Sequence, residues 1–427
     1  MKVVRWMGDL RHCSKARPTG LTGAGPCFRM AQIDGGMPAG EASHVQCASE
    51  ASKLRGPFPS GLFFGGGGRL WYAFRHGAPP AGPRGLRGRA ARMNAANNKN
   101  RPLQMINQTD VRPLTGYFTH DRIAVPNPLP EAPERPERLD VIERNMLALG
   151  MDALVRVHYA KPAPIESVIL AHDLEYVRRL EAASAGDPAA LATFDAPDTR
   201  VGPDTFDAAM KSAGAVVEAV DELYAGRIKN AFCGVRPPGH HAARAEARGF
   251  CYLNNVAIGA YWAMRRHGAR RVAIVDFDAH HGDGTEEIVA NHPDIRFMSL
   301  FQWPLYPHRM MEPTPKNVVV SPVAAGADGA VFTDILENVW LPQLEAFRPD
   351  IIFVSAGFDA HVEEQMAQLK VKELDYARIT RRLLDAADVL CEGRLVSVLE
   401  GGYAVRSLAR SVMAHLNMLV MRGRTAR

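Results

Sequence analysis

Short apolar runs that end in polar, glycine-containing motifs are the feature of this sequence that most restricts its fold. The runs are rich in Val, Ile, Leu and Ala, and segments with helical periodicity alternate with them. We predict strands at 231–235, 271–277, 295–300, 351–355 and 395–399. We predict helices at about 134–149, 204–225, 253–267, 330–346, 372–391 and 404–421. Because nearly continuous apolar strands must be covered on both faces, the pattern predicts a single α/β domain with a mainly parallel central sheet flanked by helices on both faces.

Carboxylate and imidazole side chains follow two of these runs, at the point where each strand is expected to end. The run RRVAIVDFD ends at Asp278 and leads into AHHGDG, which supplies His280, and IIFVSAGFDAH supplies Asp359. Alternation along extended backbone would point Asp278 and His280 the same way, with Asp276 one step deeper. Two carboxylates and one imidazole that leave a fourth position open are typical of a catalytic zinc site.

Further candidates for chemistry follow the remaining runs. His240 and His241 come just after the strand at 231–235, and Tyr403 comes after the two glycines that end the strand at 395–399. A histidine pair can take a proton from an attacking water and deliver one to a leaving amine, with Asp276 and Asp283 available to hold one ring each. The Tyr403 phenol could donate a hydrogen bond to a developing oxyanion. Because ligands gather outside the carboxyl ends of parallel strands, we expect all these side chains at one edge of the sheet.

The first part of the chain has a different character. Residues 1–110 contain GGGG at 65–68 and an Arg-rich, Pro-rich stretch at 78–92, and they show no sustained apolar periodicity. We expect this extension to be disordered. It is either an organelle transit peptide or upstream sequence translated ahead of a true start at Met93 or Met105. Residues 111–427 are the expected catalytic domain.

Composition narrows the function classes. The chain is 47% hydrophobic and 23% charged, which is enough for a large core, and its net charge is only +5. Because Lys and Arg outnumber Asp and Glu strongly before residue 100, the rest of the chain is net acidic, and nucleic acid is not an expected partner. Six cysteines without a CxxC pair fit a reducing compartment, and no long apolar run or secretory signal is present. We expect a cytoplasmic protein without a membrane partner.

Taken together, the motifs resemble the histone deacetylase and acetylpolyamine amidohydrolase superfamily, including the bacterial histone deacetylase-like amidohydrolases. The resemblance covers most of residues 115–421, in the order PERPERL (133–139), RPPGHHA (236–242), GFCYLNN (249–255), DFDAHHGDGT (276–285), SAGFDAH (355–361) and LEGGY (399–403). It implies hydrolysis of an N-acetyl amide, of lysine or of a polyamine, to acetate and free amine by metal-activated water. It also implies zinc on Asp278, His280 and Asp359, His240 and His241 as the proton-transfer pair, and Tyr403 as the oxyanion donor.

The resemblance has further implications for the surroundings of the zinc site. Gly249 and Phe250 would line a narrow acyl-amine channel, and Arg138 would lie near the deep cavity that receives acetate. A structural potassium ion would be held below the zinc site by side-chain and carbonyl oxygens. Its ligands would come from Asp276, Asp278, His280, Ser299 and Leu300.

Two departures from the family pattern fall in loops that we expect at the rim of the channel. Phe301 stands where a histidine is common, and YPHRM at 306–310 stands where PGTG is common. Ala132 likewise replaces a frequent histidine. We expect these changes to bear on substrate preference more than on chemistry.

Two other functions compete with this interpretation. A dinuclear manganese hydrolase of the arginase or agmatinase type would need an aspartate where Gly282 stands and another where His361 stands. A catalytically inactive homologue that binds acetylated ligands should have lost a metal ligand or Tyr403, and this sequence has lost neither. The sequence does not distinguish acetyl-lysine from acetylpolyamine as the substrate, and it does not define the oligomeric state.

Overall fold

The computed structural model describes residues 114–424. The predicted disordered extension at 1–110 lies outside the described residues. Among the residues that are described, no helix combines the length and apolar character needed to cross a bilayer.

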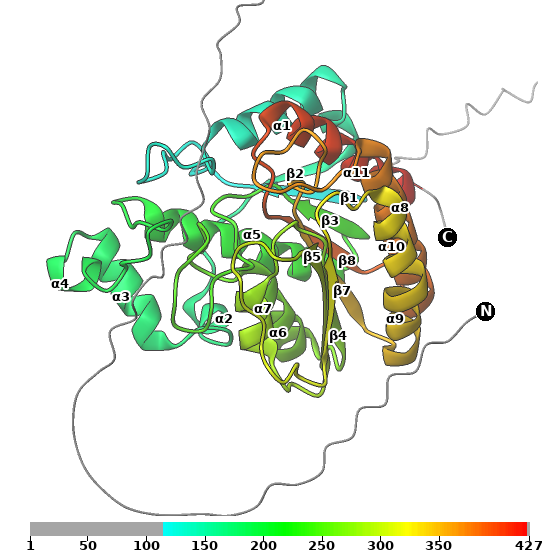
Figure 1. The fold of residues 1–427 in the computed structure, drawn as a ribbon. Coiled ribbons are helices and arrows are strands. Elements are labelled where there is room, and N and C mark those ends of the chain that lie inside the picture. Colours follow the sequence, from blue (N-terminus) through cyan, green and yellow to red (C-terminus); the bar gives the residue numbers. More distant parts are fainter. Residues whose placement is uncertain (1–113, 425–427) are drawn as a thin grey trace, which may run out of the picture. The chain divides into compact units, whose positions relative to one another are not determined.

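An eight-stranded parallel sheet forms the centre of the domain (Figure 1). The strand order is β2-β1-β3-β8-β7-β4-β5-β6, and every pairing is parallel. The strands are β1 (Thr115–Thr119), β2 (Arg156–Tyr159), β3 (Asn230–Cys233), β4 (Val272–Asp276), β5 (Ile295–Gln302), β6 (Val318–Val323), β7 (Ile351–Ala356) and β8 (Leu395–Leu399). This sheet confirms the predicted fold class.

Helices cover both faces of the sheet. One face packs against α2 (Ile165–Val168), α3 (Leu174–Ser184), α4 (Pro188–Leu191), α5 (Thr205–Tyr224), α6 (Asn255–His267) and α7 (Asp283–Val289). The other packs against α1 (Glu137–Ala148), α8 (Gly329–Ile335), η2 (Leu336–Trp340), α9 (Leu341–Phe347), α10 (Glu373–Cys391) and α11 (Val405–Arg424). A short 3-10 helix, η1 (Asp152–Leu154), precedes β2.

Alternation along the central strands divides the interior into two cores. In β4, Val272 and Ile274 face the core under α5 and α6, whereas Ala273 and Val275 face the core under α10 and α11. All four residues are fully buried. This two-sided burial explains why the strand has no alternating polar residues and why it was recognisable in the sequence as a continuous apolar run.

Three strands and several short helices were not predicted. β2 and β6 are the two edge strands. β6 contains Pro322, which is tolerated at an edge because no neighbouring strand would accept a hydrogen bond from its N–H.

The helix predicted at 330–346 is divided into α8, the π-helical η2 and α9. Pro342 in the first turn of α9 accounts for the widened turn before it, because proline cannot donate the regular backbone hydrogen bond.

Candidate active site at the carboxyl edge of the sheet

Four neighbouring strands deliver the predicted site residues to one edge of the sheet. In the sheet order β3-β8-β7-β4, the loop after β3 carries His240 and His241 and the loop after β8 carries Tyr403. The loop after β7 carries Asp359, and the bend after β4 carries Asp278 and His280. Because the strands are parallel and adjacent, residues more than 160 positions apart meet at this edge.

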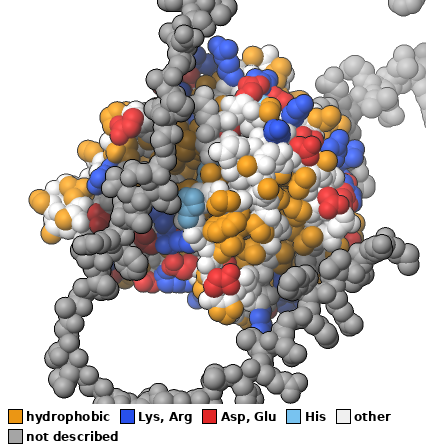
Figure 2. Space-filling view, viewed as in Figure 1, with side chains coloured by type: hydrophobic (Ala, Val, Ile, Leu, Met, Phe, Trp, Pro, Cys, Tyr) orange, Lys and Arg blue, Asp and Glu red, His pale blue; other side chains and the backbone are white. Residues whose placement is uncertain are grey.

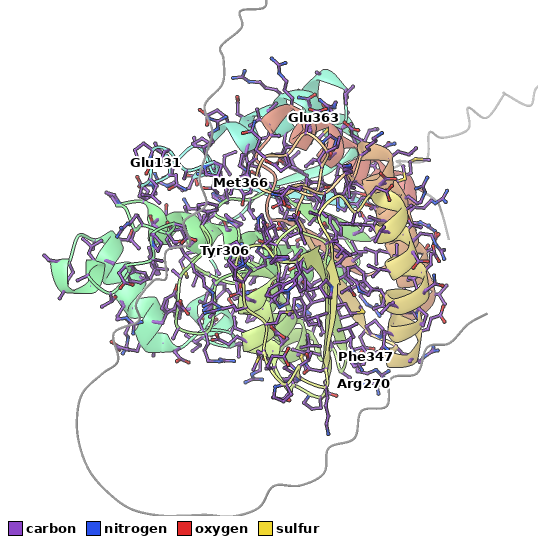
Figure 3. All side chains as sticks on the ribbon, viewed as in Figure 1. Glu131, Arg270, Tyr306, Phe347, Glu363 and Met366 are labelled. Atoms are coloured by element: carbon purple, nitrogen blue, oxygen red, sulfur yellow. The ribbon has the colours of Figure 1, made fainter. Side chains whose placement is uncertain are left out.

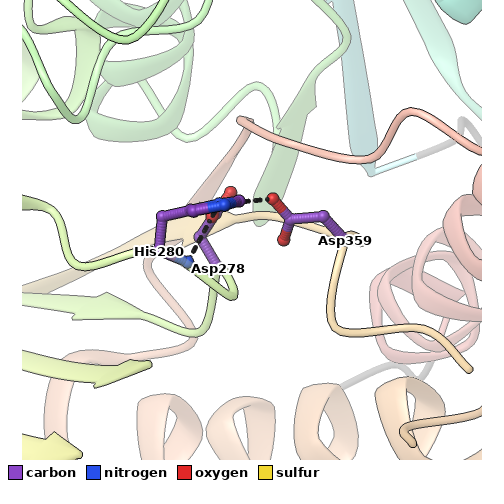
Figure 4. A group of neighbouring side chains, drawn as sticks. All are labelled: Asp278, His280 and Asp359. Atoms are coloured by element: carbon purple, nitrogen blue, oxygen red, sulfur yellow. Dashed lines mark hydrogen bonds and ion pairs between the residues drawn. The ribbon is translucent and has the colours of Figure 1, made fainter. Parts of the chain in front are cut away.

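Asp278, His280 and Asp359 form a compact buried group that could hold a metal ion (Figure 4). One ligand atom from each residue lies within 4.8 Å of the others. His280 Nδ1 lies 3.1 Å from Asp278 Oδ1 and 2.9 Å from Asp359 Oδ2. Two carboxylates and an imidazole are a donor set that suits zinc.

The backbone after β4 brings these ligands together by bending rather than by strand alternation. β4 ends at Asp276, and residues 278–280 form a bend. The carboxylate of Asp276 accepts the N–H of Asp278 at 3.1 Å, and the carboxylate of Asp278 accepts the N–H of His280 at 2.9 Å. Such turns, in which an aspartate accepts the N–H two residues later, fix the direction of each side chain. The extended geometry assumed in the sequence argument is therefore not what aligns Asp278 with His280.

Glycines in neighbouring loops leave the space that the two carboxylates occupy. A Cβ atom at Gly357 would lie 1.9 Å from Asp278 Oδ2, and one at Gly401 would lie 2.2 Å from Asp359 Oδ2. The Gly401 N–H also donates to Asp278 Oδ2 at 2.8 Å. Gly357 and Gly401 are thus required because a side chain at either position would collide with a candidate metal ligand.

The charges of this group favour a bound cation. Burial and the charge of Asp278 raise the pKa of Asp359 to about 6, because two buried carboxylates side by side repel each other. Burial opposes protonation of His280, but the charges of Asp359 and Asp278 outweigh it and raise the His280 pKa to about 10. A positive charge between the carboxylates is therefore stabilising, and a divalent cation would supply it.

His240 and His241 are held by different carboxylates. His240 Nδ1 lies 3.0 Å from Asp276 Oδ2, and His241 Nδ1 lies 2.7 Å from Asp283 Oδ1. Burial lowers the pKa of both rings, but for His240 the charges of Asp276 and Asp278 outweigh burial and raise the pKa well above its usual range. For His241, burial and the charge of His240 prevail and lower the pKa to about 4. The predicted pairing of each histidine with one aspartate is present.

A cavity of about 180 Å³ lies beside His241 and His280. Its lining includes Gly249 and Phe250, as predicted for the channel, and also His241, His280 and Tyr403. Tyr306, from the segment 306–310 expected at the rim, also lines the cavity, whereas Asp198 and Met366 were not predicted. Phe301, which was expected in a rim loop, instead lies in β5 and is buried. In Figure 3, Tyr306 and Met366 lie near the middle of the molecule, whereas Arg270, which precedes β4, lies toward the opposite end of the sheet. In Figure 2 a histidine side chain is visible near the centre of the same face, beside Lys or Arg side chains.

Tyr403 lies between the channel and a buried arginine. Its ring makes an edge contact with Phe250 at 5.9 Å between centroids, and the Arg138 guanidinium lies 4.9 Å from its centroid. Burial raises the Tyr403 pKa well above its usual range, so the phenol keeps its proton and can donate a hydrogen bond. Arg138 is fully buried and donates from Nε to the Gly402 carbonyl at 2.6 Å. It also lies 3.3 Å from Glu134.

Asp276, Ser299 and Leu300, the predicted potassium ligands, lie side by side on β4 and β5. Asp276 and Ser299 are register partners, and Leu300 is the next residue of β5. All three are at most 1% exposed. Ser299 Oγ lies 3.0 Å from His281 Nδ1.

Glu400 is a further residue of this edge to which the sequence argument gave no role. Its carboxylate accepts the N–H groups of Gly239 at 2.7 Å and His240 at 3.1 Å, and burial raises its pKa to about 7. It therefore fixes the backbone of the loop that carries the histidine pair. Glu400 belongs to the LEGGY motif, so the sequence did mark it as a residue of interest. No pattern in the sequence, however, predicted its contact with the loop after β3.

Several known proteins are similar in sequence to this chain. The chain is 36% identical over 300 residues to a probable deacetylase of Archaeoglobus fulgidus, which covers 68% of this chain and 82% of that protein. It is 34% identical over 282 residues to the histone deacetylase-like amidohydrolase of Pseudomonas aeruginosa, covering 64% and 72%. It is 34% identical over 307 residues to the human polyamine deacetylase HDAC10, covering 67% of this chain and 44% of that protein.

A solved structure and a family model agree with these relatives. The crystal structure of the HDA15 HD domain superposes with a TM-score of 0.66 at 30% identity, covering 72% of this chain and 89% of that one. The model of the histone deacetylase domain matches residues 132–419, which include the buried Asp-His-Asp group and both histidines. The chain therefore belongs to the histone deacetylase family.

Proposed function

We propose that this protein is a zinc-dependent deacetylase that hydrolyses an N-acetyl amide, of lysine or of a polyamine, to acetate and free amine. The observation that carries the proposal is the buried group of Asp278, His280 and Asp359, with ligand atoms within 4.8 Å of one another and with His280 lining a cavity. Residues 111–427 are the proposed catalytic domain.

The donor set supports one metal ion rather than two. Gly282 offers no ligand, and His361 Nε2 lies 3.4 Å from Glu373 Oε1. A dinuclear manganese site of the arginase type would need carboxylates at both positions. A zinc ion held by Asp278, His280 and Asp359 would polarise the amide carbonyl and make a water molecule acidic enough to attack it.

The two histidines have different proposed roles. His241 lines the cavity, and its pKa of about 4 keeps the ring neutral and able to accept a proton from water. The same ring then donates that proton to the leaving amine. His240 does not line the cavity and is held in its charged form by Asp276, so its role is electrostatic. Asp283 orients His241, and Asp276 orients His240.

Tyr403 is the proposed oxyanion donor. Its phenol keeps its proton, and its ring lines the same cavity as His241 and His280. As negative charge develops on the carbonyl oxygen, a hydrogen bond from Tyr403 becomes stronger and lowers the barrier. The nearby charge of Arg138 supports this role, and the deep position of Arg138 is compatible with acetate binding.

The lining of the cavity favours an extended acyl-amine substrate. Phe250 and Tyr306 give it aromatic walls, and Gly249 contributes a wall without a side chain. A linear alkyl chain that carries the acetamide would fill this space. The family relatives include proteins named as an amidohydrolase and as a polyamine deacetylase, which supports acetylated amines as the substrate class. Asp276, Ser299 and Leu300 are the proposed site of a structural potassium ion.

A substrate panel tests the proposal. Zinc-loaded, full-length protein is assayed with acetyl-lysine peptides, acetylspermidine, acetylputrescine and acetylcadaverine, and acetate release is measured before and after zinc removal. We expect zinc-dependent hydrolysis of at least one substrate, and a preference of roughly tenfold or more would define the substrate class. Protein that contains stoichiometric zinc but releases no acetate from any of them would support the inactive homologue instead.

A further inference from the structure

The loop between β5 and β6 attaches to the first turn of α7. Arg309 in this loop donates from Nε to Asp283 Oδ2 at 2.7 Å. Two residues later, the Met311 N–H donates to Glu286 Oε2 at 3.1 Å. Asp283 and Glu286 are one turn apart on α7, so both contacts hold the loop to the same face of that helix.

Asp283 is the residue that connects Arg309 to the proposed chemistry. One carboxylate oxygen, Oδ1, lies 2.7 Å from His241 Nδ1. The other, Oδ2, accepts from Arg309 and also from Arg248 Nε, at 2.8 Å. The Asp283 side chain is 2% exposed, so these contacts determine its orientation. A carboxylate held on both sides in this way has no freedom to rotate away from His241.

The same loop supplies a wall of the cavity. The Tyr306 ring stands nearly perpendicular to the His241 ring, at 88° and 5.0 Å between centroids. Tyr306 precedes Arg309 by three residues, and Trp303 at the start of the loop is fixed by its N–H to the Val323 carbonyl at 2.8 Å. Arg309 therefore anchors the segment that places Tyr306 against His241.

The energetics of the Arg309 contact point to positioning rather than to global stability. Its side chain is 46% exposed, and ion pairs that are this accessible to solvent contribute little to folding. Asp283 already has a buried partner in Arg248, whose side chain is 7% exposed. The second guanidinium is thus not needed to offset the burial of the Asp283 charge. Instead, the Arg309 guanidinium links the loop between β5 and β6 to the Asp283 carboxylate.

We propose that Arg309 is a positioning residue for deacetylation, which acts through Asp283 to hold the His241 ring and the Tyr306 wall in one arrangement. The inference rests on the proposed function, because it takes His241 as the group that moves the proton. It also changes the expectation for the segment YPHRM at 306–310. This departure from the family pattern acts on the catalytic pair as well as on the channel rim.

The test uses Arg309→Met, which keeps a side chain of similar length without charge, and Arg309→Lys, which restores a positive donor. We expect Arg309→Met to lower kcat by roughly tenfold with KM changed by less than about threefold. Its Tm should stay within about 2 °C of wild type, and Arg309→Lys should recover most of the lost kcat. Arg135→Met is the matched control, because Arg135 is also half exposed and, within residues 114–424, its ion pair is with Glu137, at 3.9 Å; it should retain wild-type kcat.

A double-mutant cycle with Asp283→Asn tests the route of the effect. If Arg309 acts through Asp283, Arg309→Met should have little further effect on kcat in the Asp283→Asn background. The proposal is overturned if Arg309→Met leaves kcat unchanged, if it lowers kcat equally in both backgrounds, or if Arg135→Met has the same effect.

A second measurement separates this inference from the proposed function. In full-length protein labelled with ¹⁵N-histidine, Arg309→Met should shift the His241 ring resonances, Arg309→Lys should largely restore them, and Arg135→Met should leave them in place. An inactive wild-type protein would contradict the proposed function but would leave this comparison intact. Unchanged His241 resonances in Arg309→Met would contradict the role of Arg309 whatever the activity.

Discussion

The rings of His240 and His241 lie 4.0 Å apart, yet each is held by a different aspartate. The charge of Asp276 favours the protonated form of His240, and the positive charge of His240, together with burial, disfavours protonation of His241. Two adjacent residues of one loop therefore have opposite protonation states. This division matches the needs of a reaction that requires one fixed positive charge and one group able to exchange a proton.

Replacement of the two histidines should have unequal effects. His241→Asn removes the ring that lines the cavity, so we expect kcat to fall by at least roughly 10²-fold. His240→Asn removes an electrostatic contribution and should reduce kcat less. The measurement is steady-state kinetics on zinc-loaded variants whose metal content equals that of wild type. A larger loss for His240→Asn would reverse the assignment of roles.

Replacement of Tyr403 by phenylalanine should remove the oxyanion donor and keep the ring contacts with Phe250 and Arg138. We expect kcat to fall by roughly 10²-fold or more, the scale of losing one such donor. Zinc content and Tm serve as controls, because neither depends on the phenol proton. Normal turnover in a Tyr403→Phe protein with full metal content would show that the phenol has no catalytic role.

Gly401→Ala should weaken metal binding without unfolding the protein. The added methyl group would lie 2.2 Å from Asp359 Oδ2 and 2.6 Å from Asp278 Oδ2, so both carboxylates would have to move. We expect zinc affinity to fall by roughly 10- to 100-fold, as for other changes to the support of metal ligands. Affinity is measured by competition with a chromophoric chelator, with circular dichroism as the folding control. Wild-type zinc affinity in Gly401→Ala would contradict this prediction, because both carboxylates would then accommodate the added methyl group without weakening metal binding.

Stability should fall on acidification because His415 is buried in its neutral form. Burial lowers its pKa to about 3, and its ring contacts the hydroxyls of Ser397 at 2.9 Å and Thr380 at 2.6 Å. The unfolded chain, with a histidine pKa of about 6.5, binds more protons than the folded one between these values. Stability due to this group is therefore complete above about pH 6.5 and decreases as pH falls toward 3, by roughly 1.4 kcal/mol per pH unit.

Denaturant unfolding between pH 4 and pH 7 measures this effect. The experiment compares wild type, His415→Gln and His308→Gln, with a chelator present so that metal binding does not contribute. His415→Gln should show a smaller dependence of the unfolding free energy on pH, and His308→Gln, which replaces an exposed histidine, is the control for loss of a histidine. Identical pH dependence in all three proteins would exclude His415 as an acid-sensitive group.

The sequence was most informative where one local pattern determines the structure. The five central strands were predicted because both faces of each strand are buried, as Val272 to Val275 illustrate. The edge strand β2 was missed because its burial alternates and its four residues include Arg156 and His158. The candidate metal ligands were predicted from short motifs, in which Asp278 and His280 are two residues apart. Their alignment nevertheless comes from a bend that was not foreseen.

Contacts between distant loops were not predictable in the same way. Glu400 reaches the backbone of Gly239, 161 residues away in sequence, and Arg309 reaches Asp283 across 26. Neither contact follows from residue type or spacing, because each depends on where separate segments of the chain meet at the carboxyl edge of the sheet. The lining of the cavity by Asp198 and Met366 has the same origin. These are the residues through which one member of a family can differ from another.

Metal content per chain tests the central claim most directly. Full-length wild type and Asp278→Ala are prepared in parallel, and zinc and manganese are measured by inductively coupled plasma mass spectrometry on the samples used for acetate release. The proposed site predicts close to one zinc per chain and zinc-dependent activity in wild type, with both lost in Asp278→Ala. Close to two manganese ions per chain, or full activity in a variant without metal, would contradict it.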